Sequence, residues 1–323
     1  MKNYYHVSPS HDGWTNLATD EWILDNIEDD ELFLFFYVNK NAVILGKNQN
    51  PWKECNMDAM NQDGVQLVRR ITGGGAVYHD CGNLNFSFIA GKNRYDVDKQ
   101  LGMILQALRA LGIPCECSGR NDMLCQGKKF SGNAFCSRKG ARQHHGTLLI
   151  HSDLSKLQNY LNVDARKLEA KGVTSVRSRV CNLTDFSMTL SVPIMISSLR
   201  QAFRKTYGDY TEWMPQGLAL AEIQTYREKH ASFDWRIGQT PRFDIEFDTR
   251  FPWGGAQLLL TLLDGKVSAV ELFTDALDNQ LPNTVRDLLQ GCPFEKVQLV
   301  DALYVSENEQ IRDIASFIAM EHF

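Results

Sequence analysis

Short apolar runs mixed with a helical stripe constrain the fold of this chain more than any other feature. Residues 32–38 and 42–45 are apolar runs separated by the polar triplet 39–41, which predicts two strands joined by a tight turn. Apolar residues then recur at helical spacing over 97–111, and Gly112 follows as a stop signal. Strands with helices inserted among them predict an α+β fold.

The same patterns continue along the chain. Further predicted strands are 66–68, 76–78, 84–88, 122–125, 147–150, 258–263 and 267–273. Further predicted helices are 14–27, 154–161, 194–207, 283–289 and 309–320.

Glycine and proline cluster between residues 237 and 253, which indicates a domain boundary. A length of 323 residues predicts about two domains, and we place them at 1–245 and 246–323. In the second domain, the Asp264-Gly265 pair predicts the turn of a β-hairpin.

Charge and cysteine content limit the classes of partner. The formal net charge of −5 provides no global field for nucleic acid or an anionic membrane, so we expect neither partner. No apolar run approaches the roughly 20 residues that span a bilayer. Eight scattered cysteines in a chain too large to need disulfides favour reduced thiols and a cytoplasmic location.

The densest concentration of informative residues is the segment 69–80, RRITGGGAVYHD. Three consecutive glycines lack Cβ atoms, which lets a ligand approach the backbone and lets successive N–H groups converge on an anion. Arg69 and Arg70 add permanently charged donors. The segment matches neither the P-loop nor the dinucleotide-binding pattern. Glycine content alone supports a plain tight turn as well as it supports a binding loop.

A second segment places Asp122 shortly before the pair Lys128-Lys129. Paired lysines between glycines are typical of a solvated turn, but one of them can also neutralise a phosphate or an acyl oxygen. The Asp122 carboxylate suits Mg²⁺, which takes one or two carboxylates together with phosphate oxygens. Adjacent residues of a strand face opposite sides, so we expect only one lysine at a site, and only one of His144 and His145.

Basic side chains are in excess over residues 165–180, in a chain that is net negative. Such a run is usually a solvated surface. Its glycine and hydroxyl residues also suit a loop that closes over a polyanionic ligand.

In this order and spacing, these segments resemble the lipoate-protein ligase family. The matching motifs are RRITGGGAVYHDCGN at 69–83, GRND at 119–122, KKFSG at 128–132, HHGTLL at 144–149, KGVTSVRSRV at 171–180, FPWGG at 251–255 and FTD at 273–275. The resemblance implies an α+β catalytic domain of the biotin/lipoyl protein ligase type, related to class II aminoacyl-tRNA synthetases. It also implies a small α/β C-terminal accessory domain.

The family reaction implied by this resemblance has two steps. ATP activates lipoate to lipoyl-AMP, and the lipoyl group then passes to a lysine of a lipoyl domain. The implied acceptors are the E2 subunits of 2-oxoacid dehydrogenases and the glycine-cleavage H protein. Octanoate is expected to fit the same apolar slot less well than lipoate.

The resemblance also implies roles for individual residues. Lys129 matches the catalytic lysine, between the lipoyl carbonyl and the AMP phosphate, and Asp122 is implied near Mg²⁺. The residues implied to bind lipoate and nucleotide are Arg70, Gly73, Gly74, Gly75, Ala76, Val77, Tyr78, Asn83, Asn121, Lys171 and Arg177.

Two alternatives compete with this hypothesis. An octanoyl or lipoyl amidotransferase uses a cysteine acyl-enzyme and no ATP, and Cys136 is the thiol nearest to Lys129 in sequence. The basic loop motif and the accessory domain argue against it. A non-catalytic lipoate-binding paralogue is the other alternative, and the joint presence of Arg70, Lys129 and Asp122 argues against that class.

Overall fold

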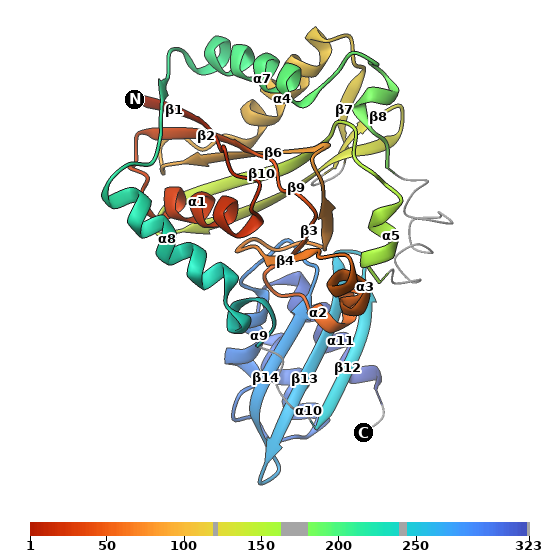
Figure 1. Ribbon diagram of the computed structural model, residues 1–323. Helices are drawn as coiled ribbons and strands as arrows, with labels where there is room; N and C mark the ends of the chain where they lie inside the picture. Colours follow the sequence, from red (N-terminus) through yellow and green to blue (C-terminus); the bar gives the residue numbers. More distant parts are fainter. Residues whose placement is uncertain (119–121, 163–179, 239–243, 322–323) are drawn as a thin grey trace.

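A mixed eight-stranded sheet forms the centre of the larger part of the molecule (Figure 1). The computed structural model describes residues 1–118, 122–162, 180–238 and 244–321. In spatial order the strands are β11 (Thr211–Glu212), β1 (Lys2–Val7), β2 (Glu31–Tyr37), β6 (Asn83–Ala90), β10 (Ala141–Leu149), β9 (Lys128–Arg138), β8 (Asp122–Cys125) and β7 (Cys115–Ser118). The pairs β11–β1 and β1–β2 are parallel, and the other neighbours are antiparallel.

Helices cover both faces of this sheet. On one face lie α4 (Val97–Ala110) and α7 (Val192–Tyr207), and on the other lies α1 (Gly13–Asn26), with α8 (Leu218–Ala231) packed on α1. The remaining helices of this part, α2 (Pro51–Glu54), α3 (Met57–Gln62) and α5 (Lys156–Tyr160), lie by a second, smaller sheet, and η2 (Leu183–Asp185) and η3 (Asp234–Gly238) are short helical turns. Alternate residues of β2 face the two layers: Leu34 and Phe36 share a core with α4 and α7, whereas Phe33 and Phe35 share one with α1. Burial on both faces explains why β2 is apolar throughout.

A second sheet, of three strands, lies beside the first. Its order is β4 (Gln66–Arg69), β3 (Ala42–Leu45) and β5 (Val77–His79). Both strands predicted at 32–38 and 42–45 are present, but they do not pair across the turn between them, because β2 and β3 belong to different sheets. The Asn39 side chain is fully buried between Asn16 and His79, so the polar triplet anchors a crossing between sheets.

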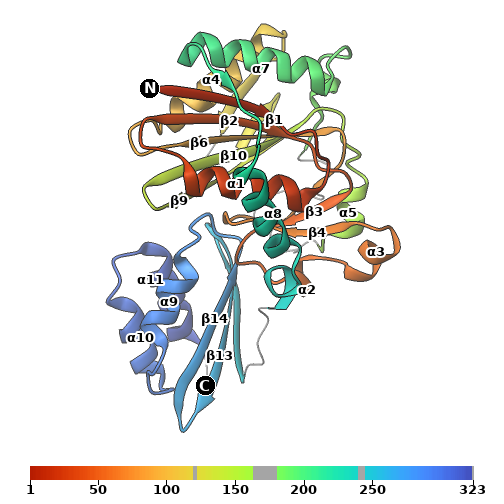
Figure 2. The ribbon, with the colours of Figure 1, turned by 60° about the vertical axis from the view of Figure 1, so that its left-hand side comes forward.

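The C-terminal part is an antiparallel three-stranded sheet with helices on one face (Figure 2). Its elements are β12 (Ile245–Phe251), β13 (Gly254–Leu263), β14 (Lys266–Thr274), α9 (Leu281–Leu289), α10 (Lys296–Tyr304) and α11 (Glu309–Met320). The predicted Asp264-Gly265 turn is confirmed, and both residues have positive φ, 51° and 73°, as a two-residue hairpin loop prefers.

The structure confirms the α+β fold with a C-terminal accessory domain. The boundary between residues 245 and 246 stays a prediction. Among the described residues, no helix is long and apolar enough to cross a membrane.

Candidate active site

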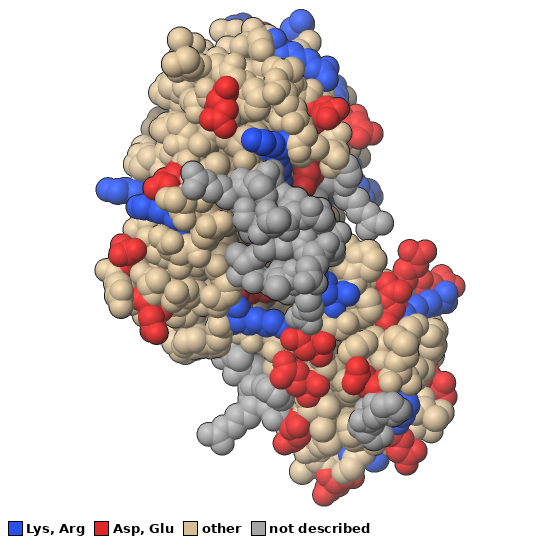
Figure 3. Space-filling model, turned by 90° about the vertical axis from the view of Figure 1, so that its right-hand side faces the viewer, with Lys and Arg blue, Asp and Glu red and all other residues tan. Residues whose placement is uncertain are grey.

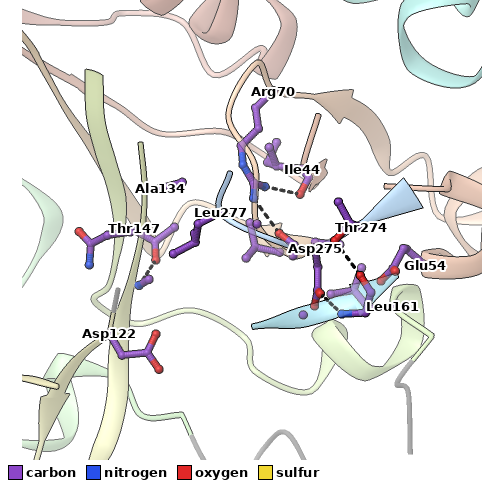
Figure 4. Close-up of a pocket in the computed structure, with 18 of the residues that line it drawn as sticks. Ile44, Glu54, Arg70, Asp122, Ala134, Thr147, Leu161, Thr274, Asp275 and Leu277 are labelled. Atoms are coloured by element: carbon purple, nitrogen blue, oxygen red, sulfur yellow. Dashed lines mark hydrogen bonds between the residues drawn. The ribbon is translucent and has the colours of Figure 1, made fainter. Parts of the chain in front are cut away.

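A cavity of about 1030 Å³ lies between the two parts of the molecule. From the larger part it is lined by the β4–β5 connection, β6, β9 and β10, and from the C-terminal part by β12, β13, the segment after β14 and the start of α11. Figure 4 shows Thr147 and Asp122 at the left of the view and Arg70 at the top, with Leu277 between Thr147 and Arg70 and with Asp275 below Arg70. Segments more than 200 positions apart therefore form one site.

The three glycines lie in the connection from β4 to β5 and meet the C-terminal part directly. The Gly74 N–H donates to the Ala276 carbonyl at 2.9 Å, and a Cβ at Gly73 would lie 2.5 Å from that same oxygen. Gly74 also has a φ of +93°, which a residue with a side chain rarely adopts. Gly73 and Gly74 thus serve close contact between the two parts, whereas Gly75, Ala76 and Val77 line the cavity together with Gly74.

Arg70 is buried beneath this loop, and most of its guanidinium N–H groups donate hydrogen bonds to loop residues. Its guanidinium donates to the carbonyls of Gly73 at 2.7 Å, Gly75 at 2.9 Å and Ile44 at 3.2 Å, and Nε donates to Thr72 Oγ1. Burial lowers the pKa of Arg70 to about 10, which leaves it charged at neutral pH. Arg70 therefore shapes the loop and brings a positive charge to the cavity that it also lines.

Lys129 enters the cavity from β9. Its Nζ lies 2.7 Å from Asp122 Oδ1 on the neighbouring strand β8, and both side chains are about one quarter exposed, at 25% and 23%. Lys128 is exposed and does not line the cavity, which confirms that only one lysine of this pair faces it. A Cβ at Gly132 would lie 3.0 Å from Lys129 Nζ, so the glycine of the lysine motif leaves room for the ammonium group.

Asp122 is the carboxylate predicted to hold Mg²⁺. Within the described ranges, no three His, Cys, Asp or Glu side chains converge as they would around an ion held by protein alone. Mg²⁺ needs only one or two carboxylates when phosphate oxygens and water complete its shell. The Asp122 carboxylate at the cavity wall fits that kind of donor set.

Three buried polar atoms on the cavity wall have no hydrogen-bond partner: Asn83 Oδ1, Ser131 Oγ and His79 Nε2. Burial lowers the pKa of His79 to about 3, so the ring is neutral. Asn39 Nδ2 donates to its Nδ1 at 3.1 Å, which places the ring proton on Nε2. An unsatisfied buried polar group costs about 1–3 kcal/mol, so a ligand with matching donors and acceptors gains affinity here.

Sequence reasoning identified Asn83 but missed His79 and Ser131 as site residues. Both lie inside motifs that were recognised, and strand alternation was the available signal: His79 follows Val77 on the same face of β5, and Ser131 follows Lys129 on β9. Tyr78 lines the cavity, and its hydroxyl donates to Asn41 at 3.0 Å. The predicted residues Asn121, Lys171 and Arg177 lie outside the described residues.

The two histidines of β10 divide as strand alternation predicts. His144 is buried among Phe86, Phe88 and Phe135, whereas His145 lines the cavity.

Comparison with known proteins identifies the family of this chain. The model of the lipoyl protein ligase A/B catalytic domain matches residues 12–268, and that of the bacterial lipoate protein ligase C-terminus matches residues 240–318. The chain belongs to the lipoyl protein ligase A/B family. The ligase has the catalytic fold and accessory domain that the motifs implied, and it is an enzyme of the ligase class.

Solved structures agree with this assignment. The ligase superposes on P. falciparum LipL1 in complex with lipoate with a TM-score of 0.88 and 28% identity, covering 99% of this chain and 100% of the other. A bipartite lipoate protein ligase from Thermoplasma acidophilum, described with its E2 lipoyl domain, superposes with a TM-score of 0.66 at 30% identity. The match covers 76% of this chain and 100% of the other. A lipoate-protein ligase A bound with ATP superposes with a TM-score of 0.66 at 28% identity, and the match covers 74% of this chain and 100% of the other.

Proposed function

We propose that this ligase uses ATP to activate lipoate to lipoyl-AMP and then transfers the lipoyl group to a lysine of an acceptor domain. The observation that carries the proposal is that the Lys129 ammonium and the Arg70-supported glycine loop line the same cavity. Relatives of the same fold bind lipoate or ATP, which supports both substrates.

The first step brings two anions together, because the lipoate carboxylate attacks the α-phosphate of ATP and pyrophosphate leaves. Lys129 is proposed to lie between the acyl carbonyl and the phosphate and to stabilise the negative charge that develops in both steps. Arg70 adds a second positive charge through its place behind the loop. Mg²⁺ held at Asp122 would supply further charge neutralisation on the phosphates.

The inner wall of the cavity suits an acyl chain. Its apolar lining includes Leu17, Ile44, Val77 and Ala134. Each CH₂ of the ligand that such a wall buries contributes about 0.8 kcal/mol. Lipoate is the proposed substrate, and octanoate is expected to bind less tightly because it lacks the dithiolane ring.

The proposed ligand-binding residues on the cavity wall are Arg70, Gly74, Gly75, Ala76, Val77, Tyr78 and Asn83. Gly73, also predicted, does not line the cavity and is proposed only to shape the loop. Asn121, Lys171 and Arg177 complete the proposed set from segments outside the described residues. The proposed acceptors are lipoyl domains of E2 subunits and the glycine-cleavage H protein. The cysteines are free thiols, which is consistent with a cytoplasmic reaction.

The environment of Cys136 gives the amidotransferase alternative no support. Its thiol is buried, it does not line the cavity, and burial raises its pKa, which disfavours the thiolate that an acyl-enzyme requires. Asn279 Nδ2 donates to its sulfur at 3.4 Å, so Cys136 packs where the C-terminal part docks.

Intact-mass analysis of a purified apo lipoyl domain, incubated with the ligase and lipoate, tests the proposal. We expect a lipoyl mass gain that requires ATP and that falls by about a hundredfold or more in Lys129→Ala, since a charge aimed at the transition state is lost. Lys128→Ala is the matched control and is expected to retain activity. A gain without ATP from an octanoyl donor, or loss in Lys128→Ala but not in Lys129→Ala, would contradict the proposal.

A further inference from the structure

A chain of three hydrogen bonds runs from α1 to the glycine loop behind the cavity wall. Arg70 Nε lies 2.9 Å from Thr72 Oγ1, which lies 2.8 Å from His145 Nε2. His145 Nδ1 lies 3.4 Å from Asp20 Oδ2. All four residues are buried. The chain therefore joins α1, β10 and the loop in one buried network.

The donor and acceptor roles are fixed at the two ends of this network. Arg70 Nε–H can only donate, so Thr72 Oγ1 accepts from it. Thr72 Oγ1 also forms a hydrogen bond with His145 Nε2. A carboxylate can only accept, so the Nδ1 of His145, on the other side of the ring, carries a proton. Nδ1–H donates to the Asp20 carboxylate. The imidazole of His145 therefore bridges the Thr72 hydroxyl and the Asp20 carboxylate.

The chain acts on the loop through Arg70. The other guanidinium donors of Arg70 bind the carbonyls of Gly73 and Gly75, so the orientation of Arg70 sets the positions of these peptide groups. Thr72 and Asp20 do not line the cavity, although Arg70 and His145 do. Any influence of Thr72 and Asp20 on a bound ligand must therefore pass through their partners.

We propose that Asp20, His145 and Thr72 are positioning residues, which hold Arg70 and the glycine loop in the shape that binds the anionic groups of ATP and lipoate. The inference rests on the proposed function, since it takes these substrates as the ligands of the loop. Removing one bond of the chain frees Arg70 to adopt other rotamers, and the loop then loses its preorganised form.

Thr72→Val in the full-length ligase tests the proposal through steady-state pyrophosphate release with lipoate, ATP and an apo lipoyl domain as the acceptor. We expect the KM for ATP to rise about tenfold with kcat within about twofold, because a hydrogen bond to a charged group that supports ground-state binding is lost. Thr72→Ser keeps the hydroxyl and is expected to restore the KM. An unchanged KM in Thr72→Val, or no restoration by Thr72→Ser, would overturn the proposal.

A double-mutant cycle tests whether the residues act as one chain. Asp20→Asn is expected to raise the KM about threefold, because an amide oxygen accepts more weakly than a carboxylate. Combined with Thr72→Val, it is expected to add little beyond the single change. Fully additive effects would count against a chain. Thr19→Val is the matched control, because its hydroxyl donates to the Thr15 carbonyl of the same helix, outside the network.

Amide hydrogen exchange over residues 70–78 separates this proposal from the proposed function. Exchange there is expected to be faster in Thr72→Val than in Thr19→Val, whatever reaction the protein catalyses. Equal exchange in the two variants would overturn the positioning role. If the wild-type protein releases no pyrophosphate with lipoate and ATP, the proposed function fails, and the exchange result still decides the structural claim.

Discussion

The larger part of the molecule and the C-terminal part bury polar groups in different ways. Every buried side-chain atom without a hydrogen-bond partner in the described chain lies between residues 20 and 230, and several of them line the cavity. In contrast, the core beneath β12, β13 and β14 is apolar and mostly aliphatic, with residues such as Leu260, Leu299 and Ile314. In the larger part, unpartnered polar atoms lower the stability of the ligand-free protein, and a ligand that bonds to them can restore it. The described C-terminal part has an apolar core and no such atoms.

The two parts also differ in charge. Residues 246–323 contain thirteen acidic and five basic residues, whereas residues 1–245 contain 26 acidic and 29 basic residues. Figure 3 shows acidic side chains concentrated on the C-terminal part, at the bottom of that view. On the cavity wall Arg250 pairs with Asp275, and Asp248 with Lys53 from the larger part. The proposed cations for anionic substrates therefore come from the larger part, as Arg70 and Lys129.

A substitution in the aliphatic core gives the largest stability effect and tests whether the two parts unfold separately. Leu299 is fully buried on α10, so Leu299→Ala is expected to destabilise the C-terminal part by about 2–5 kcal/mol. Hydrogen exchange is expected to accelerate in residues 245–321 but not in β2 or β6. Equal acceleration in both parts would break the comparison. Val297→Ala, at an exposed site on the same helix, is expected to stay within about 0.5 kcal/mol.

Acid is expected to weaken the larger part through Glu21, whose carboxylate joins α1 to α8 and β9. Burial alone raises the pKa of Glu21, but hydrogen bonds and charge from His230 and Lys229 outweigh this and lower the pKa to about 2. The unfolded value is about 4.3, so the contribution is complete above that pH and is lost as the pH falls toward 2. The lowered pKa of Glu21 contributes about 3 kcal/mol to the free energy of unfolding at neutral pH.

Urea unfolding of Glu21→Gln at several pH values measures this contribution. The variant is expected to be less stable than the wild type near pH 7, with the difference shrinking in acid. Glu222→Gln is the matched control on the same helix pair, where Glu222 accepts from Trp22 Nε1 at 2.9 Å. A difference that stays constant from neutral to acidic pH would contradict the assignment.

Ser131→Ala gives the smallest effect on stability and the sharpest test of the polar cavity wall. Because Ser131 Oγ is buried without a partner, its removal is expected to leave the free energy of unfolding unchanged or raise it by up to about 1 kcal/mol, while lipoylation slows. Ser198→Ala is the control: it loses a hydrogen bond to the Ala107 carbonyl and is expected to lower the free energy of unfolding by about 1 kcal/mol. A similar loss in both variants would show that Ser131 has a structural role.

Local sequence patterns predicted the structure correctly where the environment of a residue depends only on the helix, strand or turn that contains it. Alternation along a strand predicted that only one of Lys128 and Lys129 faces the cavity, and the family motif assigned that place to Lys129. Asp264-Gly265 predicted a hairpin turn. Periodicity missed α8, because only Ile223 and His230 of that helix are buried. Ion pairs such as Lys229 with Glu21 hold α8 to α1, and these leave no apolar stripe in the sequence.

The sequence by itself determined the family motifs, the mixed α+β composition and the lysine that enters the cavity. Only the tertiary structure decided that Gly73 and Gly74 meet Ala276, and that Asp20, 125 positions from His145, completes the network behind Arg70. The physical reason is that periodicity and turn chemistry report on neighbours within a few residues. A hydrogen bond between distant segments depends on how sheets and domains pack, which no local pattern encodes.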